Sequence, residues 1–411
     1  MIFSCKKNEV KSLSDGKLRI VFVSPEFIEP KTGLIPAGGL ANYLHKITDI
    51  LNKMENEIHV VVVGSVKKEI NYNGIHLHFI KRRNIFGFKK YRNSANPSAM
   101  VVRDYLENFN KKYKIDIIQY ASYLSLGQFP LSYIPACVRV SSYAKLHQEA
   151  AGYVNKAEAD NEREMYKASK FIFGPSNKTN AFIKADLGLE NEIKTIETPF
   201  VKYNKDEDFS VYNERLKGKD YMLFFGTLWA LKGSEEIAEI IYDFLDAYKN
   251  MHFAFVGKQN KDKKNNSYPI DKIIKNSKEY KDRVIYIDSQ QHSSLYPIIK
   301  NARAVILPSR YDNFPNTCIE AMSLGKVVLG CGDAGFDQII TDGETGFLCK
   351  AYNSASLLCG LNKIMSLSAG QLDDIGKKAV LRVMKLTPQK IAGEMLFYYN
   401  DIIKNWKIKN D

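Results

Sequence analysis

Cysteine is scarce in this chain, with six residues in 411. No two of them form a C-x-x-C pair, and no histidine joins them at metal-ligand spacing. Small secreted domains depend on dense disulfides, and zinc sites need closely spaced Cys and His ligands. The sequence therefore excludes a disulfide miniprotein and predicts reduced core thiols of a cytoplasmic protein without a bound metal. The six residues are Cys5, Cys137, Cys318, Cys331, Cys349 and Cys359.

Long apolar runs are also missing. The chain contains no stretch of 18 apolar residues, the length at which a spanning helix is expected. The short apolar start at residues 1–3 is soon followed by Lys6 and Lys7, unlike the extended apolar core of a signal peptide. We therefore expect neither a membrane-spanning helix nor a signal peptide. Hydrophobic residues make up 45% and charged residues 26% of the chain, which is typical of a globular protein and not of a disordered one.

Acidic residues are outnumbered, with 46 Asp and Glu against 59 Lys and Arg, a net charge of +13. Residues 1–200 hold 29 basic and 20 acidic residues, a net of +9, and residues 201–411 hold 30 and 26, a net of +4. Such an excess favours an anionic partner: a membrane surface, a nucleic acid or a phosphorylated ligand. Solvated surface lysines are the alternative interpretation.

What the sequence does contain is a series of short apolar runs that alternate with amphipathic stretches. Runs such as residues 18–24 and 59–64 predict buried strands, and residues 40–52 and 156–167 predict helices. Residues 198–204 are predicted to be a linker, after which a second series of strands begins. This alternation is typical of βαβ units, so we predict an α/β protein with two doubly wound domains. Further strands are predicted at residues 75–80, 115–121, 170–176, 221–225, 252–257, 283–288, 304–308, 327–330 and 346–349.

Residues 308–322, PSRYDNFPNTCIEAM, form the most informative segment. Pro315 stands where a helix would begin, and the amides of Asn316 and Thr317 at that N-terminus could hold a diphosphate. Glu320 follows on the same helix face, where it could contact a ribose. Asp312 lies in the preceding loop, where it could hold a sugar. The alternative is that Asp312 caps the helix and Glu320 is a solvated helix residue.

This segment resembles the E-x7-E motif of retaining glycosyltransferases with the GT-B fold, glycosyltransferase family 4. The resemblance continues through EAMSLGKVVL, residues 320–329, and DAGFDQIITDGETGFL, residues 333–348. Asp312 stands where the family usually has Glu, and Gln338 stands where Glu is common. The resemblance implies a catalytic role for Asp312 and donor contacts from Phe314, Asn316, Thr317 and Glu320.

Residues 224–236, FFGTLWALKGSEE, resemble the family's G-R-L-x-x-x-K-G phosphate loop. Gly226 would let the backbone approach the donor, and Lys232 would neutralise its diphosphate. Thr227 replaces the usual Arg, and Arg310 is a candidate for supplying that charge. Lys232 could instead be an ordinary surface residue, but a cation at a helix start is unfavourable unless an anion lies nearby.

Residues 25–46 resemble the N-terminal glycine-containing loop of GT-B glycosyltransferases and, more distantly, the K-T-G-G-L loop of glycogen and starch synthases. The resemblance implies that the amides of Gly38 and Gly39 face the donor phosphates. The loop is not G-x-G-x-x-G, so a nicotinamide cofactor has little support. Gln290 is a candidate for a contact to the base by its position after a strand. Ser141 and Ser142 occupy the strand end near which many members place a histidine.

Residues 81–92, KRRNIFGFKKYR, combine basic and aromatic side chains. Such a segment can lie against an anionic bilayer or contact an acceptor, and a solvated loop is the alternative. No other feature resembles a nucleic-acid-binding module, so we expect no nucleic acid partner. The candidate residues are Lys81, Arg82, Arg83, Lys89, Lys90 and Arg92.

The resemblance implies a retaining hexosyltransferase that moves a sugar from a nucleotide-diphosphate sugar to a glycan or lipid-linked acceptor in bacterial-type polysaccharide or glycoconjugate synthesis. The resemblance implies two Rossmann-like domains facing across a deep cleft. Residues 1–200 would bind the acceptor, residues 201–387 the nucleotide sugar, and a helix at 388–411 would cross back to the first domain. We expect no cofactor or metal, with Lys232 and Asp312 as catalytic residues, and a cytoplasmic location that includes the inner face of the membrane.

Three alternatives stay open at this point. One is a UDP-sugar epimerase with the GT-B fold, and another is a degenerate module that only binds sugar nucleotides. The third is an α-glucan synthase similar to glycogen and starch synthases, although LeuIleProAla interrupts the lysine loop before Gly38.

Overall fold

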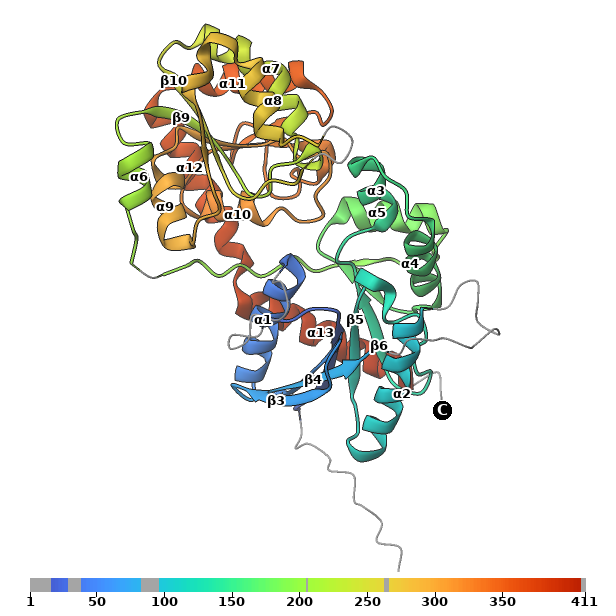
Figure 1. The fold of residues 1–411 in the computed structure, drawn as a ribbon. Helices are drawn as coiled ribbons and strands as arrows, with labels where there is room; N and C mark the ends of the chain where they lie inside the picture. Colours follow the sequence, from blue (N-terminus) through green and yellow to red (C-terminus); the bar gives the residue numbers. More distant parts are fainter. Residues whose placement is uncertain (1–15, 29–37, 83–95, 205, 262–265, 408–411) are drawn as a thin grey trace, which may run out of the picture. The chain divides into compact units, whose positions relative to one another are not determined.

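The computed structural model describes residues 16–28, 38–82, 96–204, 206–261 and 266–407 (Figure 1). The chain forms two compact units. The first contains Met1–Gln148, Tyr153–Pro199 and Pro388–Asp411, and the second contains Glu149–Gly152 and Phe200–Thr387. Each unit is built around its own sheet, which confirms the predicted class of two doubly wound α/β domains.

The first unit has an eight-stranded sheet in the order β3-β4-β2-β1-β5-β6-β7-β8. β1 (Arg19–Ser24) pairs in parallel with β2 (Glu57–Gly64) on one side and with β5 (Ile117–Ala121) on the other. β1 and β5 are buried along their whole length, as expected of strands with helices on both faces. The other strands are β3 (Lys68–Tyr72), β4 (Ile75–Lys81), β6 (Ala136–Arg139), β7 (Ile172–Gly174) and β8 (Lys194–Thr195).

The edge strand β3 was not predicted from the sequence. It pairs antiparallel with β4, and its residues alternate between half-buried and exposed. A polar edge strand resists pairing with other chains, but it lacks the apolar run by which strands are recognised. Its pairing with the apolar β4 is what defines it.

Helices cover both faces of this sheet. α1 (Gly39–Lys53) and α13 (Pro388–Lys407) place Leu44 and Tyr399 in one cluster with Phe22 of β1. On the opposite face, Leu106 and Tyr166 belong to a second cluster. The helices that contribute to this second face are α2 (Pro97–Lys112), α4 (Lys156–Ala168) and α5 (Asn177–Leu187), and α3 (Ala144–Ala151) follows β6.

The second unit has a six-stranded, fully parallel sheet in the order β11-β10-β9-β12-β13-β14. Its strands are β9 (Asp220–Phe225), β10 (Met251–Val256), β11 (Val284–Ile287), β12 (Ala304–Leu307), β13 (Val328–Cys331) and β14 (Phe347–Cys349). One face is covered by α9 (His292–Asn301), α10 (Asn316–Ser323) and α12 (Ala369–Val383). The other is covered by α7 (Ser234–Ala247), α8 (Pro269–Asn276) and α11 (Ser354–Met365), and α6 (Ser210–Arg215) precedes β9.

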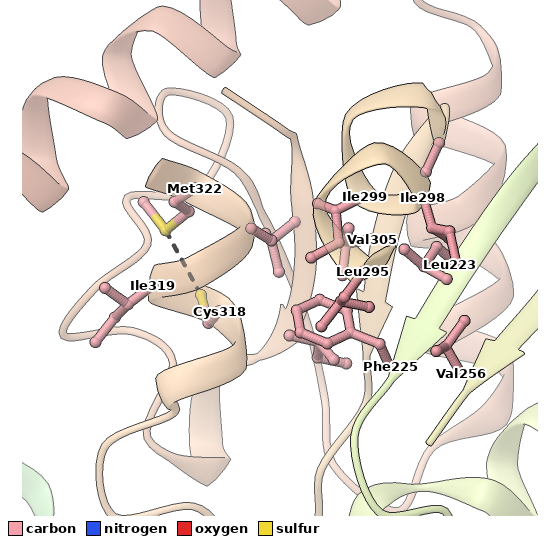
Figure 2. Packing of buried hydrophobic residues seen from close by; sticks show 14 of the residues in the cluster. Leu223, Phe225, Val256, Leu295, Ile298, Ile299, Val305, Cys318, Ile319 and Met322 are labelled. Carbon is pink, nitrogen blue, oxygen red and sulfur yellow. Dashed lines mark hydrogen bonds between the residues drawn. The ribbon is translucent and has the colours of Figure 1, made fainter. Parts of the chain in front are cut away.

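Figure 2 shows how the core orients α10. Cys318, Ile319 and Met322 belong to the same buried cluster as Val305 of β12, and Cys318 Sγ lies 3.5 Å from Met322 Sδ one turn further on. Burying an Ile or Met side chain stabilises by roughly 1.5–3 kcal/mol, so the helix is held on this face. Helical periodicity then leaves three predicted site residues less buried: Asn316, Thr317 and Glu320.

Two loops meet at the carboxyl edge of this sheet. Gly233 ends the loop after β9 with a φ of +81°, and a Cβ atom there would lie only 2.1 Å from the Pro308 carbonyl oxygen. The Arg310 amide donates to the Leu231 carbonyl oxygen over 2.8 Å. Only glycine combines this backbone conformation with so close an approach, so Gly233 sets the spacing of the two loops.

We expect Gly233→Ala to lower the free energy of unfolding by about 3 kcal/mol or more, because left-handed backbone and steric overlap both oppose a side chain. Gly218 is the matched control, since it has a φ of +78° but no atom within 4 Å of the place that a Cβ would occupy. Gly218→Ala should cost only about 1 kcal/mol. Chemical denaturation followed by circular dichroism measures both, and equal losses would contradict the prediction.

Candidate active site

Several of the predicted donor residues of the second unit lie where its strand order reverses. β9 pairs with β10 on one side and with β12 on the other, so the chain leaves β9 and β12 toward opposite halves of the sheet. Ligands of open α/β sheets bind in the crevice beyond the carboxyl ends of the strands at such a reversal. Lys232 lies in the loop after β9, and Asp312 lies in the loop after β12.

These two side chains form an ion pair. The Lys232 Nζ atom lies 2.5 Å from Asp312 Oδ2, with 29% of the lysine side chain and 17% of the aspartate side chain exposed. The Asp312 amide also donates to the Ala334 carbonyl oxygen over 2.9 Å, which fixes the loop from a third strand end. A half-buried pair of this kind keeps its charges accessible, so an anionic ligand can compete with Asp312 for the ammonium group.

Arg310 is held by a different acid. Its Nε donates to Glu236 Oε1 over 2.8 Å, and its guanidinium lies 4.9 Å from the Tyr352 ring centroid. Glu236 is in the first turn of α7 and its side chain is only 5% exposed. The guanidinium charge is therefore neutralised within the unit. This weighs against Arg310 as the substitute for the arginine that the family usually has at the position of Thr227.

The N-terminus of α10 faces the same region. Its N-cap residue is Pro315, whose side chain makes no capping hydrogen bond, and a helix N-terminus of this kind suits an anionic acceptor. A Cβ atom on Gly226 would lie 3.5 Å from Thr317 Cγ2, which places the glycine turn after β9 against the first turn of α10. The structure thus brings Gly226, Thr317 and the Lys232–Asp312 pair to one end of the sheet.

Glu320 has a neighbour that the sequence motifs did not reveal. His292 Nε2 lies 3.1 Å from Glu320 Oε1, and the imidazole stacks on Tyr203 with a centroid distance of 5.5 Å. Burial, and then the Glu320 carboxylate, raise the pKa of Tyr296 to about 12. His292 begins α9, two residues after Gln290, and no sequence motif marked it because the contact joins segments 28 residues apart.

Two other predicted donor residues have more local partners. The side-chain Nε2 of Gln290 donates to the Asp288 carbonyl oxygen over 3.0 Å, in the loop after the edge strand β11. Phe314 is 7% exposed and belongs to the hydrophobic cluster of the second unit. Its side chain is therefore a core residue in this structure and is not displayed toward a ligand.

The glycine loop of the first unit has an internal anion. Glu26 Oε1 accepts a hydrogen bond from the Ala41 amide over 2.9 Å, and the Gly38 backbone also hydrogen-bonds this carboxylate. Burial raises the pKa of Glu26 despite these bonds. The start of α1, which includes Gly39, thus already holds a carboxylate where the sequence predicts a phosphate.

The basic segment is described only at its start. Lys81 ends β4 and is exposed, and so is Arg82. Four of the candidate residues lie outside the described residues: Arg83, Lys89, Lys90 and Arg92. Within the described ranges, no helix combines the length and the apolar character needed to cross a membrane.

Residues 205–381 match the family described as glycosyl transferases group 1. This match lies within the second unit. Along most of the chain, an uncharacterized glycosyltransferase of Methanocaldococcus jannaschii is 22% identical over 349 residues, 80% of this chain and 86% of the relative. The residues that match the family include all the donor residues predicted in the second unit.

Solved structures agree over both units. Sucrose-phosphate synthase from Thermosynechococcus elongatus superposes with a TM-score of 0.74 at 14% identity, covering 95% of this chain and 100% of that structure. Anabaena HepE, solved with UDP and glucose, superposes with a TM-score of 0.70 at 13% identity over 93% and 100% of the two chains. The predicted GT-B glycosyltransferase fold is confirmed, and membership of family 4 stays a prediction.

The first unit contains a buried acid whose protonation is testable. Glu162 of α4 is 4% exposed, and burial raises its pKa to about 8 although Oε2 accepts from the Ala144 amide over 2.6 Å. The folded state therefore keeps a proton that the unfolded chain loses near pH 4.5. Stability from this group is present below pH 4.5 and is lost as the pH rises toward 8.

We expect Glu162→Gln to flatten the pH dependence of stability between pH 4.5 and 8, removing a change on the order of 4 kcal/mol. Glu164→Gln, at an exposed position of the same helix, should leave the slope as it is. Denaturation midpoints across this pH range measure both. An unchanged slope in the Glu162 variant would show that its carboxyl is ionised in the folded protein.

Proposed function

We propose that this protein is a retaining glycosyltransferase that moves a sugar from a nucleotide-diphosphate sugar to a glycan or lipid-linked acceptor. The observation that carries the proposal is the Lys232–Asp312 pair beside the uncapped α10, within the residues that match glycosyl transferases group 1. HepE, a structural neighbour, was solved with UDP-glucose and with UDP and glucose. The same class of donor suits a site that offers one ammonium group, backbone amides and a carboxylate.

The donor chemistry follows from these groups. When the bond between the anomeric carbon and the phosphate oxygen breaks, its electron pair stays on the diphosphate. Lys232 and the amides of Asn316 and Thr317 would stabilise that charge, and the scheme draws on no metal or other cofactor. Asp312 would accept hydrogen bonds from the sugar hydroxyls. Glu320, held by His292, would accept hydrogen bonds from the ribose.

Retention would follow from attack on the face that the diphosphate leaves. The acceptor hydroxyl oxygen forms the new bond to the anomeric carbon, and its proton passes to an oxygen of the departing phosphate. No side-chain nucleophile is needed, because one bond to the anomeric carbon forms as the other breaks and the released proton ends on the phosphate. Bacterial-type polysaccharide or glycoconjugate synthesis is the role that we propose for the product.

We expect Lys232→Ala and Asp312→Ala each to lower kcat about 100- to 1,000-fold, the range for loss of one group that stabilises a developing charge. The two should differ in UDP binding. Lys232→Ala should weaken UDP binding because the ammonium group is lost. Asp312→Ala should not weaken it, because this change frees the Lys232 ammonium group for the diphosphate. The readouts are sugar-nucleotide turnover and calorimetric titration with UDP.

A matched pair exists in the same unit, where Lys249 Nζ lies 2.5 Å from Asp246 Oδ1 with both side chains exposed. Lys249→Ala should leave turnover and UDP binding unchanged. Full activity in the Lys232 or Asp312 variant would overturn the assignment. An inverted anomeric configuration in the product, read by proton NMR, would overturn retention alone. An epimerised free sugar formed without any acceptor would identify an epimerase.

We also propose that residues 81–92 let the protein contact an anionic membrane while it uses a lipid-linked acceptor. The support is the basic and aromatic composition of the segment, in which each basic side chain near the surface contributes about 1 kcal/mol. Replacing its six basic residues by Gln should abolish sedimentation with phosphatidylserine-containing vesicles and leave UDP binding intact. Unchanged sedimentation would assign the charge to ordinary surface solvation.

A further inference from the structure

The first unit contains a polar hollow that the donor chemistry does not use. The segments after β5 and β6 enclose a cavity of about 430 Å³, which we call the serine pocket. Ser122 and Ser125 line it from the first segment, Ser142 from the second, and Glu158 and Glu162 from α4. A second cavity of about 490 Å³ shares four lining residues with it: Tyr123, Leu124, Ser125 and Glu158.

A strained turn forms the wall between the two hollows. Leu124 and Ser125 have φ values of +61° and +50°, a conformation that costs non-glycine residues roughly 1–2 kcal/mol each. The Asn96 side chain holds the turn, since Nδ2 donates to the Leu124 carbonyl oxygen over 2.5 Å. Asn96 also caps α2 through the Ser98 amide. Such strain persists only where the surroundings enforce it, and it gathers at ligand sites.

Hydrogen bonds fix the floor of the serine pocket. Ser122 Oγ accepts from the Ser141 amide over 3.0 Å and donates to the Ser142 carbonyl oxygen over 3.3 Å. Glu162 accepts from the Ala144 amide and also bonds the Ser122 side chain. The two strand ends are thus tied together, and the pocket exists before any ligand arrives.

The charged side chains that line the serine pocket favour a neutral ligand over a phosphorylated one. No lysine or arginine lines the serine pocket, and Arg82 is the single one that lines the neighbouring cavity among the described residues. Glu158 lines both cavities, and its carboxylate lies within 3.3 Å of amide donors on Gln148 and Asn155. His147 also lines the serine pocket, and its Nδ1 lies 3.4 Å from the Tyr153 hydroxyl. A phosphate placed here would meet the Glu158 carboxylate with no lysine or arginine in the lining to offset it, which is unfavourable. Sugar hydroxyls, which both donate and accept, match serine and carboxyl groups.

We propose that the serine pocket binds an uncharged sugar unit of the acceptor, through hydroxyl and carboxyl groups and without a lysine or arginine. The inference rests on the proposed transferase function, which it deepens by naming the class of acceptor. It assigns Ser142 as a lining residue and Glu158 as the residue that disfavours phosphorylated sugars.

The first experiment measures binding to the full-length protein without a donor. The probes are free hexoses and N-acetylhexosamines, each beside its 6-phosphate, in saturation-transfer NMR titrations. We expect saturable millimolar binding of at least one neutral sugar and at least tenfold weaker binding of its 6-phosphate. Ser142→Phe should remove the binding by filling the pocket, and Ser132→Phe, at an exposed serine that lines neither cavity, should leave it intact.

The second experiment reverses the charge. Glu158→Lys should lower the ratio of kcat/KM for the neutral sugar over its 6-phosphate at least tenfold, a change that a merely structural role would not produce. Glu164→Lys is the control, on an exposed position of the same helix.

The outcomes separate the two proposals. Turnover that is confined to phosphorylated acceptors, or absence of binding by every neutral sugar, overturns the pocket assignment and leaves the transferase standing. Neutral-sugar binding that Ser142→Phe abolishes, without turnover of any sugar nucleotide, overturns the transferase and supports the pocket.

Discussion

The candidate donor site depends on one contact, the close approach of the loops that follow β9 and β12. Gly233 lies against the Pro308 carbonyl, and the Arg310 amide bonds the Leu231 carbonyl. Because β9 and β12 are neighbours in a parallel sheet, their carboxyl ends already lie side by side. The absent Cβ of Gly233 lets the loops close the remaining distance, and Lys232 consequently meets Asp312. Core packing beneath α10 then fixes the direction of its uncapped N-terminus (Figure 2).

Charge at this edge of the sheet is compensated in pairs, and burial separates their roles. Glu236 is the least exposed of the acids, so breaking its bond to Arg310 would leave a buried charge at high cost. The Lys232–Asp312 ion pair and the contact between His292 and Glu320 are more exposed and more easily rearranged. In the proposed mechanism, a diphosphate would therefore recruit Lys232 at little cost. In the first unit, the Glu26 carboxylate accepts a hydrogen bond from an amide at the start of α1.

Much of the fold could be predicted because the strands are continuous apolar runs. β1 and β9 to β13 are buried among helices, and their sequences show it directly. β3 escaped prediction since its edge position leaves alternate residues exposed. Phe314 was assigned to the ligand by its place in a motif, whereas packing draws its ring into the core. His292 was not predicted because its contact with Glu320 joins α9 to α10, and only the tertiary fold brings these two helices together.

The sequence by itself determined the α/β class, the positions of the loops that carry Lys232 and Asp312, and the excess of positive charge, since each is local in the chain. The tertiary structure alone decided which groups meet. It paired Lys232 with Asp312 and Arg310 with Glu236, and it enclosed Ser122, Ser142 and Glu162 around one pocket. The physical reason is that parallel strands gather at one edge residues that lie far apart in sequence, and burial then sets which charges stay paired.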